Sequence, residues 1–302
     1  METAPAHPQK WKILSAFAIL YVVWGSTYFA IKVGVSQVPP FVLASIRFLI
    51  AGIVLYFWAL SRGERSPSRR EWASVSLLAI LIFVFDYGVL FWAEQRVPSG
   101  LASVMLATIP TFMALSEIII LRTQNLTLRL AAALLIGMGG VAVLVNRSLN
   151  LGGAPIDRTG ALALIFASIS FSVAAPLTRK LPLPKSKIMS SGAQIMAGGF
   201  FLAVIAAGLG EFRDFHPAAV SPQAWLALLY LIVAGSIIAF TAYVWLLHHE
   251  SPTRVGTYAY VNPVIAVLIG HFLGSEPLGP RAILGTVLVL TSVALITLTR
   301  AH

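Results

Sequence analysis

Long apolar stretches follow one another along the whole chain of 302 residues, and they constrain its fold more than any other feature. They fall at about 12–34, 40–60, 72–93, 99–121, 129–146, 159–178, 188–210, 223–248, 253–273 and 281–299. A helix needs about 20 apolar residues to cross about 30 Å of hydrocarbon, whereas a membrane barrel strand alternates in polarity over about ten residues. The sequence therefore predicts an all-α membrane protein with ten transmembrane helices and no soluble domain.

The composition agrees with this fold class and excludes several kinds of function. Hydrophobic residues make up 58% of the chain and charged residues 11%, which is far from the balance of a soluble protein. The net charge of +10 comes from Lys and Arg residues that lie between apolar stretches, so we expect no nucleic-acid partner. The chain has no cysteine, and its histidines lack the spacing of metal ligands. We therefore expect no metal site and no cofactor.

No motif of an enzyme or a channel stands out. The sequence has no G-x-S-x-G elbow, no H-E-x-x-H helix and no P-loop, so an intramembrane enzyme is not expected and we assign no catalytic residue. It also has no filter sequence and no ring of identical charges typical of a channel.

The positions of the basic residues set the expected orientation, because cytoplasmic loops carry an excess of Lys and Arg. With a cytoplasmic N-terminus, the outer side holds only Lys32, Arg96, Arg147, Arg158, Arg213 and Arg281. Arg47 lies within a span, and the other 14 of the 21 basic residues lie on the inner side. We therefore expect a multi-pass protein with both termini in the cytoplasm.

The chain repeats itself in two halves. An offset of 153 residues aligns Trp72 with Trp225, Trp92 with Trp245, and Pro110 with Pro263. The first half (1–148) and the second half (157–302) then carry five spans each. Because five is odd, the second half enters the membrane from the opposite side, and the repeats are inverted. This arrangement is typical of alternating-access carriers whose substrate site lies near the midplane.

Several motifs resemble those of the drug/metabolite transporter superfamily. The resemblance is specifically to its ten-helix members, which are built from two EamA-type repeats. The motifs are Trp24-Gly-Ser-Thr-Tyr-Phe-Ala-Ile-Lys32, Arg47-Phe-Leu-Ile-Ala-Gly52, Pro110, and the segment from Pro263 to Gly270-His-Phe-Leu-Gly-Ser-Glu276. The resemblance implies export or facilitated movement of small metabolites, including amino acids, through the bacterial inner membrane without ATP hydrolysis. One position departs from the pattern, because the first-half counterpart of Glu276 is Thr123.

Two charged residues within the predicted spans are candidates for transport. Arg47 lies roughly 10 Å below the outer surface at 1.5 Å per residue, where a charge is costly unless it faces the bundle interior or water. It could hold a substrate carboxylate; the structural alternatives are contact with the outer headgroups or pairing with Asp86. Asp86 is the deepest carboxylate in the chain and is a candidate for proton coupling, unless it only neutralises Arg47.

Aromatic and amide side chains complete the predicted site. Helical spacing puts Trp24 and Tyr28 on one helix face, and Phe83 and Tyr87 on another. The residues expected to bind substrate are Trp24, Tyr28, Arg47, Phe83, Tyr87, Tyr243, Tyr258 and Asn262. Ordinary helix packing and an interfacial aromatic belt are the alternative explanation for the aromatic residues.

The two aligned prolines suggest where the halves open and close. Pro110 and Pro263 each remove a helical hydrogen bond, and we expect paired kinks that act as gates. The leading hypothesis is a secondary carrier for a small-molecule substrate, most plausibly an amino acid, embedded in the lipid bilayer. The alternative within carriers is a multidrug or organic-cation exporter that uses the aromatic rings and Asp86.

Overall fold

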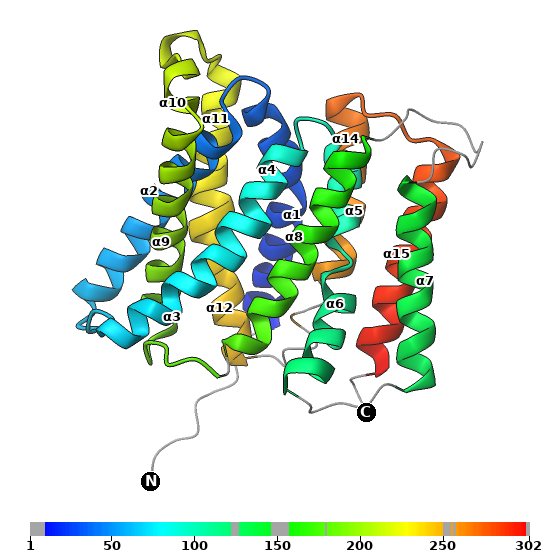
Figure 1. The fold of residues 1–302 in the computed structure, drawn as a ribbon, viewed down its shortest axis with the longest axis horizontal. Helices are drawn as coiled ribbons and strands as arrows, with labels where there is room; N and C mark the ends of the chain where they lie inside the picture. Colours follow the sequence, from blue (N-terminus) through cyan, green and yellow to red (C-terminus); the bar gives the residue numbers. More distant parts are fainter. Residues whose placement is uncertain are drawn as a thin grey trace.

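The computed structural model describes residues 10–121, 127–145, 157–178, 180–249, 255 and 258–299. These residues form a bundle of helices, and no strand occurs among them (Figure 1). The helix α1 begins, and the helix α15 ends, at the lower end of the bundle in Figure 1. We call the opposite end, which carries α10, the upper end.

The helices of the first half are α1 (Lys10–Val35), α2 (Pro40–Ser61), α3 (Arg69–Ala79), η1 (Ile80–Gly88), α4 (Val89–Ala93), α5 (Ser99–Leu106), α6 (Ile109–Ser116), η2 (Glu117–Leu121) and α7 (Leu128–Val145). Those of the second half are α8 (Arg158–Leu177), α9 (Lys187–Gly208), α10 (Glu211–Asp214), η3 (Pro217–Ala219), α11 (Pro222–Tyr230), η4 (Leu231–Ile238), α12 (Ala239–His249), α14 (Tyr258–Gly274) and α15 (Pro280–Thr299). The prediction of an all-helical membrane protein is confirmed.

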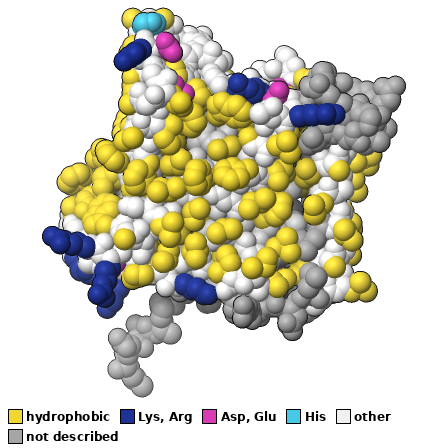
Figure 2. Space-filling model, viewed as in Figure 1, with side chains coloured by type: hydrophobic (Ala, Val, Ile, Leu, Met, Phe, Trp, Pro, Cys, Tyr) yellow, Lys and Arg dark blue, Asp and Glu magenta, His cyan; other side chains and the backbone are white. Residues whose placement is uncertain are grey.

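Six of the helical segments are long and apolar enough to cross a membrane. They are Lys10–Val35, Pro40–Ser61, Arg69–Ala93, Ser99–Ile120, Lys187–Gly208 and Pro222–Tyr243. Four shorter apolar helices accompany them, at Leu128–Val143, Arg158–Ala174, Val261–Gly274 and Pro280–Ser292. Hydrophobic side chains cover the middle of the visible face, and the basic side chains gather towards its two ends (Figure 2). This distribution matches a hydrocarbon layer between two aqueous ones.

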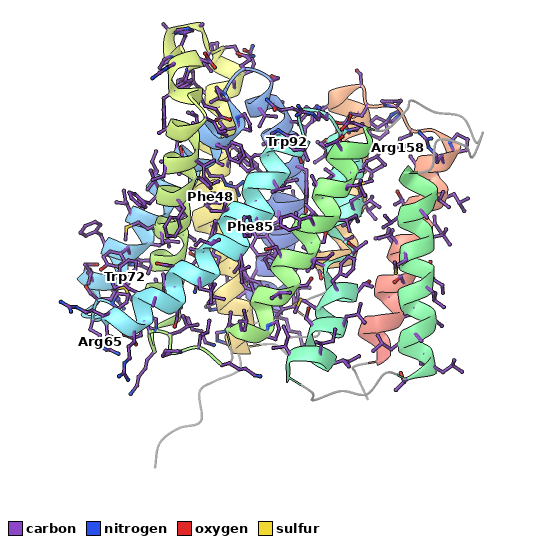
Figure 3. All side chains as sticks on the ribbon, in the orientation of Figure 1. Phe48, Arg65, Trp72, Phe85, Trp92 and Arg158 are labelled. Atoms are coloured by element: carbon purple, nitrogen blue, oxygen red, sulfur yellow. The ribbon has the colours of Figure 1, made fainter. Side chains whose placement is uncertain are left out.

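Tryptophan residues mark two ends of this apolar layer. Trp72 lies near the lower end beside Arg65, and Trp92 lies near the upper end (Figure 3). The guanidinium carbon of Arg96 lies 4.2 Å from the ring centre of Trp92. Such pairs suit the membrane interface, where one side of an indole is in contact with lipid and the other with polar groups.

The two halves of the chain are interleaved. The first helix of the first half, α1, packs against α11, η4, α12 and α14 of the second half. The first helix of the second half, α8, packs against η1, α4, α5 and α6 of the first half. Two further pairs join the halves, α2 with α9 and α7 with α15. Each half therefore completes its packing on the other.

Glycine residues permit the closest of these contacts. A Cβ atom on Gly192 of α9 would lie 2.7 Å from the backbone nitrogen of Tyr56 in α2. A Cβ atom on Gly140 of α7 would lie 2.9 Å from the backbone nitrogen of Val289 in α15. Because backbone atoms cannot move aside cheaply, only glycine allows the helices to come this close.

The fourth apolar segment is interrupted in its middle. The helix α5 ends at Leu106, and α6 begins at Ile109, immediately before Pro110. Proline has no N–H to donate to the carbonyl four residues earlier, which is that of Leu106. Its aligned partner Pro263 lies inside α14, which continues from Tyr258 to Gly274. The two prolines therefore occupy different local structures.

We predict opposite effects for alanine at two neighbouring glycines of α7. Gly140→Ala should lower the free energy of unfolding by about 1–3 kcal/mol, because its methyl group meets the backbone of α15. Gly139→Ala should leave it unchanged or raise it by up to about 1 kcal/mol, because Gly139 has open space around it and alanine favours the helix. Thermal unfolding of the purified protein in detergent measures both. Equal effects of the two substitutions would contradict the close contact of α7 with α15.

Candidate functional site

Three π-helical segments occur among the described residues, two of them in the first half: η2 (Glu117–Leu121) follows α6, and the other two lie at the candidate site. These other two are η1 (Ile80–Gly88) and η4 (Leu231–Ile238), where the sequence suggested uninterrupted α-helices. A π-turn leaves carbonyl groups available to other helices and is frequent at functional sites. Here the carbonyl of Leu81 accepts a hydrogen bond from Ser170 of α8 at 2.8 Å. The carbonyl of Gly235 accepts one from the indole nitrogen of Trp24 in α1 at 3.0 Å.

Arg47 of α2 lies at the centre of the bundle beside η4. Its side chain is only 3% exposed, and its Nε donates to the hydroxyl of Ser236 at 3.0 Å. The Ser236 hydroxyl in turn donates to the carbonyl of Leu231, five residues earlier, at 3.0 Å. The Nη1 atom of Arg47 is buried without a hydrogen-bond partner among the described residues. The Nε atom of Arg47 is therefore hydrogen-bonded within the protein, whereas its Nη1 atom is available to donate a hydrogen bond to a ligand.

Aromatic rings surround the Arg47 guanidinium. Its central carbon lies 4.9 Å from the ring centre of Phe48, 5.7 Å from that of Tyr87 and 5.8 Å from that of Phe91. Phe83 and Tyr87 stack at 5.8 Å with an interplanar angle of 14°. The rings compensate the charge only in part, since cation–π contacts are weaker than a buried ion pair.

Asp86 does not neutralise Arg47. Asp86 lies on η1 and is 4% exposed, and its Oδ1 atom has no hydrogen-bond partner in the described part of the chain. Within that part, the salt bridge present joins Arg65 and Glu71 at 2.8 Å. The burial of Arg47 also leaves no room for contact with lipid headgroups. Both structural alternatives for Arg47 thus disagree with the structure.

A second aromatic group joins α1, α12 and α14. The ring centre of Trp24 lies 5.3 Å from that of Tyr243 and 5.1 Å from that of Tyr258. With its amide nitrogen turned towards α1, Asn262 donates to the carbonyls of Tyr258 at 3.2 Å and Tyr21 at 3.3 Å. The predicted residues of these three helices therefore meet.

Tyr28 lies between the two groups. It sits one helical turn after Trp24 on α1, within electrostatic range of Asp86, Tyr87 and Tyr258. The indole of Trp24 is bonded to Gly235, the residue before the Arg47 partner Ser236. The candidate site is thus one continuous region around η1 and η4.

Glu94 and Glu211 were not singled out in the sequence, and Glu276 was noted there only as part of the family motif. The helix α2 follows Pro39 and α5 follows Pro98, and neither proline has a side chain that could accept from the first N–H groups. The lack of a capping side chain is visible in the sequence. It indicates that another part of the chain must supply the acceptor for these N–H groups.

Two carboxylates from the second half supply it. Glu211, after α9, accepts from the backbone nitrogens of Phe41 at 2.9 Å and Val42 at 3.0 Å. Glu276, after α14, accepts from Ser99 at 2.7 Å and Gly100 at 3.1 Å. Burial raises the pKa of Glu211, although its two hydrogen bonds favour the ionised form. Both carboxylates fasten the second half to helix starts of the first half.

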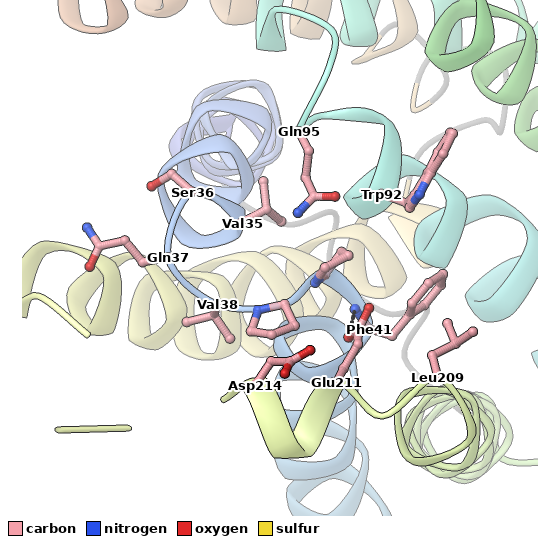
Figure 4. A pocket seen from close by; sticks show the side chains of 12 residues that line it. Val35, Ser36, Gln37, Val38, Phe41, Trp92, Gln95, Leu209, Glu211 and Asp214 are labelled. Atoms are coloured by element: carbon pink, nitrogen blue, oxygen red, sulfur yellow. Dashed lines mark hydrogen bonds between the residues drawn. The ribbon is translucent and has the colours of Figure 1, made fainter. Parts of the chain in front are cut away.

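A cavity of about 480 Å³ opens at the upper end, between the α1–α2 connection, α4 and α10 (Figure 4). Its lining includes Gln37, Phe41, Gln95, Glu211 and Asp214. None of the predicted binding residues lines this cavity, nor a smaller one between α5, α14 and α15. The residues around η1 and η4 therefore lie apart from both of these cavities.

Comparison with known proteins identifies the family. The profile of the EamA-like transporter family matches residues 11–146 and 158–298. This chain belongs to that family. It is 36% identical over 288 residues to the uncharacterized inner membrane transporter YedA of Escherichia coli (strain K12), covering 95% of this chain and 90% of YedA. The resemblance inferred from the sequence is confirmed.

More distant relatives also match this chain over most of its length. Protein PecM of Dickeya dadantii (strain 3937) is 26% identical over 276 residues, which cover 91% of this chain and 88% of PecM. A solved crystal structure at 22% identity superposes with a TM-score of 0.62 and covers 96% of this chain and 98% of its own. At that identity the likeness shows the fold alone. Its membership of the EamA-like transporter family makes the protein a membrane transporter.

We predict that Glu276→Ala weakens the start of α5. The free energy of unfolding should fall by about 1–2 kcal/mol, because two N–H groups lose their acceptor at a helix N-terminus. Glu64→Ala, at an exposed site after α2, is the matched control and should change it by less than about 0.5 kcal/mol. Thermal unfolding in detergent compares the two. Equal stability of both variants would refute the capping role.

Proposed function

We propose that this protein is a secondary carrier that moves a small organic solute, most plausibly an amino acid, across the bacterial inner membrane by alternating access. The buried Arg47 carries this proposal. A guanidinium held by Ser236 at Nε, with Nη1 unbonded, offers a hydrogen-bonding cation to a carboxylate inside the apolar layer. The surrounding rings suit the apolar part of an amphipathic solute.

Asp86 gives the site a second polar attachment point. Its Oδ1 atom is buried and unbonded among the described residues, so it can accept a hydrogen bond from a solute ammonium group or take up a proton. The notion of a zwitterionic solute rests on these two groups together. The aromatic group of Trp24, Tyr243 and Tyr258 would line the far side.

Alternating access requires two units that move against each other, and we propose two inverted five-helix repeats, within 1–148 and 157–302. Three features support this: the aligned residues of the two halves, the π-helical segments η1 and η4 at overlapping positions of the 153-residue repeat, and the mutual packing of α1 and α8 on the opposite half. Pro110 and Pro263 would then be the positions at which the paired spans bend as gates.

The proposed topology has ten spans and both termini in the cytoplasm. The described helices begin with α1 and end with α15 at the same end of the bundle (Figure 1). The excess of Lys and Arg residues supports a cytoplasmic location for that end.

The alternative is an organic-cation exporter. The observation that favours it is the ring group of Trp24, Tyr243 and Tyr258, which could hold a cation with Asp86 as its counter-charge. In that case Arg47 would have only a structural role.

We predict that Arg47→Gln separates the two functions. Counterflow in proteoliposomes is measured with L-phenylalanine and with phenethylamine, which differs by lacking the carboxylate. If Arg47 binds the carboxylate, L-phenylalanine counterflow should fall by about 10- to 100-fold, equivalent to the loss of one charged hydrogen bond. Arg62→Gln, at an exposed site after α2, is the control and should transport normally. Phenethylamine counterflow by the wild type, without L-phenylalanine counterflow, would favour the organic-cation exporter.

We predict that a reporter fused after His302 lies in the cytoplasm. A C-terminal green fluorescent protein should fluoresce, and a C-terminal alkaline phosphatase should be inactive, because the latter folds only in an oxidising compartment. The reverse pattern would overturn the proposed topology.

A further inference from the structure

Glu94 is a buried carboxyl group that packing does not explain. It directly follows α4 at the upper end of the bundle, and its side chain is 0% exposed. Neither carboxylate oxygen has a hydrogen-bond partner among the described residues. A buried carboxylate without partners is costly when ionised, so such a group is unfavourable for stability and points to a role in function.

Charged groups from three other parts of the fold surround Glu94. Lys32 of α1 donates to the backbone carbonyls of Glu94 and of Val97, so its ammonium group lies at the end of α4. Arg47 of α2 reaches α4, since its guanidinium carbon lies 5.8 Å from the ring centre of Phe91, about one turn before Glu94. Glu276, which caps α5, acts on it from the loop after α14.

The remaining neighbours contribute few ionisable groups. Tyr28 of α1 is within electrostatic range of both Glu94 and Asp86. The helix α8 packs against α4 and has no ionisable residue from Gly160 to Leu177. On α14, the His271 ring contacts the backbone carbonyl of Glu276 at 3.0 Å. Glu94 therefore lies at the upper end of α4, next to the ammonium group of Lys32.

We propose that Glu94 is a proton-binding site linked to the solute site, such that an anionic group of the solute on Arg47 and a proton on Glu94 bind together. This inference rests on the function proposed above and names its coupling ion. When no solute is bound, the Glu94 carboxylate balances the charge of Arg47. When a solute carboxylate takes over this role, Glu94 takes one proton from water at the upper end, so that Arg47 again faces one negative charge.

The sign of the linkage follows from the surrounding charges. Burial raises the pKa of Glu94 well above its usual range, Lys32 and Arg47 act to lower it, and Glu276 raises it further. A solute carboxylate offsets the charge of Arg47, which otherwise lowers the pKa of Glu94. The pKa of Glu94 therefore rises when the solute binds, and Glu94 takes up a proton. By reciprocity, a proton on Glu94 strengthens the binding of the anionic group. Proton and solute therefore travel in the same direction.

The first test needs no solute. Infrared spectroscopy of the reconstituted protein follows buried carboxyl groups through a pH titration, and the band that Glu94→Gln removes belongs to Glu94. Arg47→Gln imitates the neutralised cation and should raise the midpoint of that band by about one pH unit or more. Arg47→Lys should restore it towards wild type, and Arg62→Gln should leave it unchanged.

The second test uses the intact wild-type protein and covers the case in which an Arg47 variant does not fold. Saturating L-phenylalanine should raise the Glu94 midpoint, whereas phenethylamine should not, because it lacks the carboxylate. The titration is repeated with potassium in place of sodium. A midpoint that depends on sodium would mean that Glu94 binds a metal cation, and would overturn the proposal.

Transport in proteoliposomes separates this inference from the function itself. Glu94→Gln should keep L-phenylalanine counterflow, which needs no gradient, and should lose about tenfold or more of the uptake driven by a pH gradient. Glu64→Gln is the exposed control and should keep both. Unchanged gradient-driven uptake in Glu94→Gln, or a Glu94 midpoint insensitive to Arg47→Gln, overturns the inference. Absence of counterflow in wild type with both probes would contradict the proposed function instead.

Discussion

The low polarity of the hydrocarbon layer is the constraint on which the rest of this structure depends. Within an apolar layer, every N–H, carbonyl and charged group must find its partner in the protein, or remain unpaired at a cost. The starts of α2 and α5 illustrate the rule. Each follows a proline that offers no capping side chain, and each is completed by a carboxylate from the other half, Glu211 or Glu276. The hydrogen bonds that these two helix starts require thus connect the two halves of the chain.

The centre of the bundle illustrates the exceptions to the same rule. The π-turns of η1 and η4 leave the carbonyls of Leu81 and Gly235 available to other helices. Side chains of α8 and α1 donate hydrogen bonds to these carbonyls. Around these bonded groups, atoms of Arg47, Asp86 and Glu94 stay unbonded in the described part of the chain. Because an unpartnered buried polar atom lowers stability, its presence beside well-bonded neighbours is typical of a site that receives a ligand or a proton.

The interleaving of the halves connects this centre to transport. The helix α1 carries Trp24 and packs on η4, and η4 carries Ser236, which holds Arg47 of α2. A movement of one half against the other must therefore change the contacts of Arg47 directly. Glycines at the interfaces between halves, such as Gly140 and Gly192, allow backbones to touch without interlocking side chains, so sliding there is less costly than in a core of large residues.

The sequence by itself determined the all-helical membrane fold, the family, and the helices that carry the site, because the length and hydrophobicity of a span are local properties. Local spacing also sufficed for the pairing of Phe83 with Tyr87, which lie one turn apart and stack. Only the tertiary structure decided which charges meet. Arg47 is bonded to Ser236, 189 residues away, and not to Asp86. The π-turns and the unbonded carboxyl group of Glu94 likewise depend on neighbours from distant helices, which no local pattern encodes.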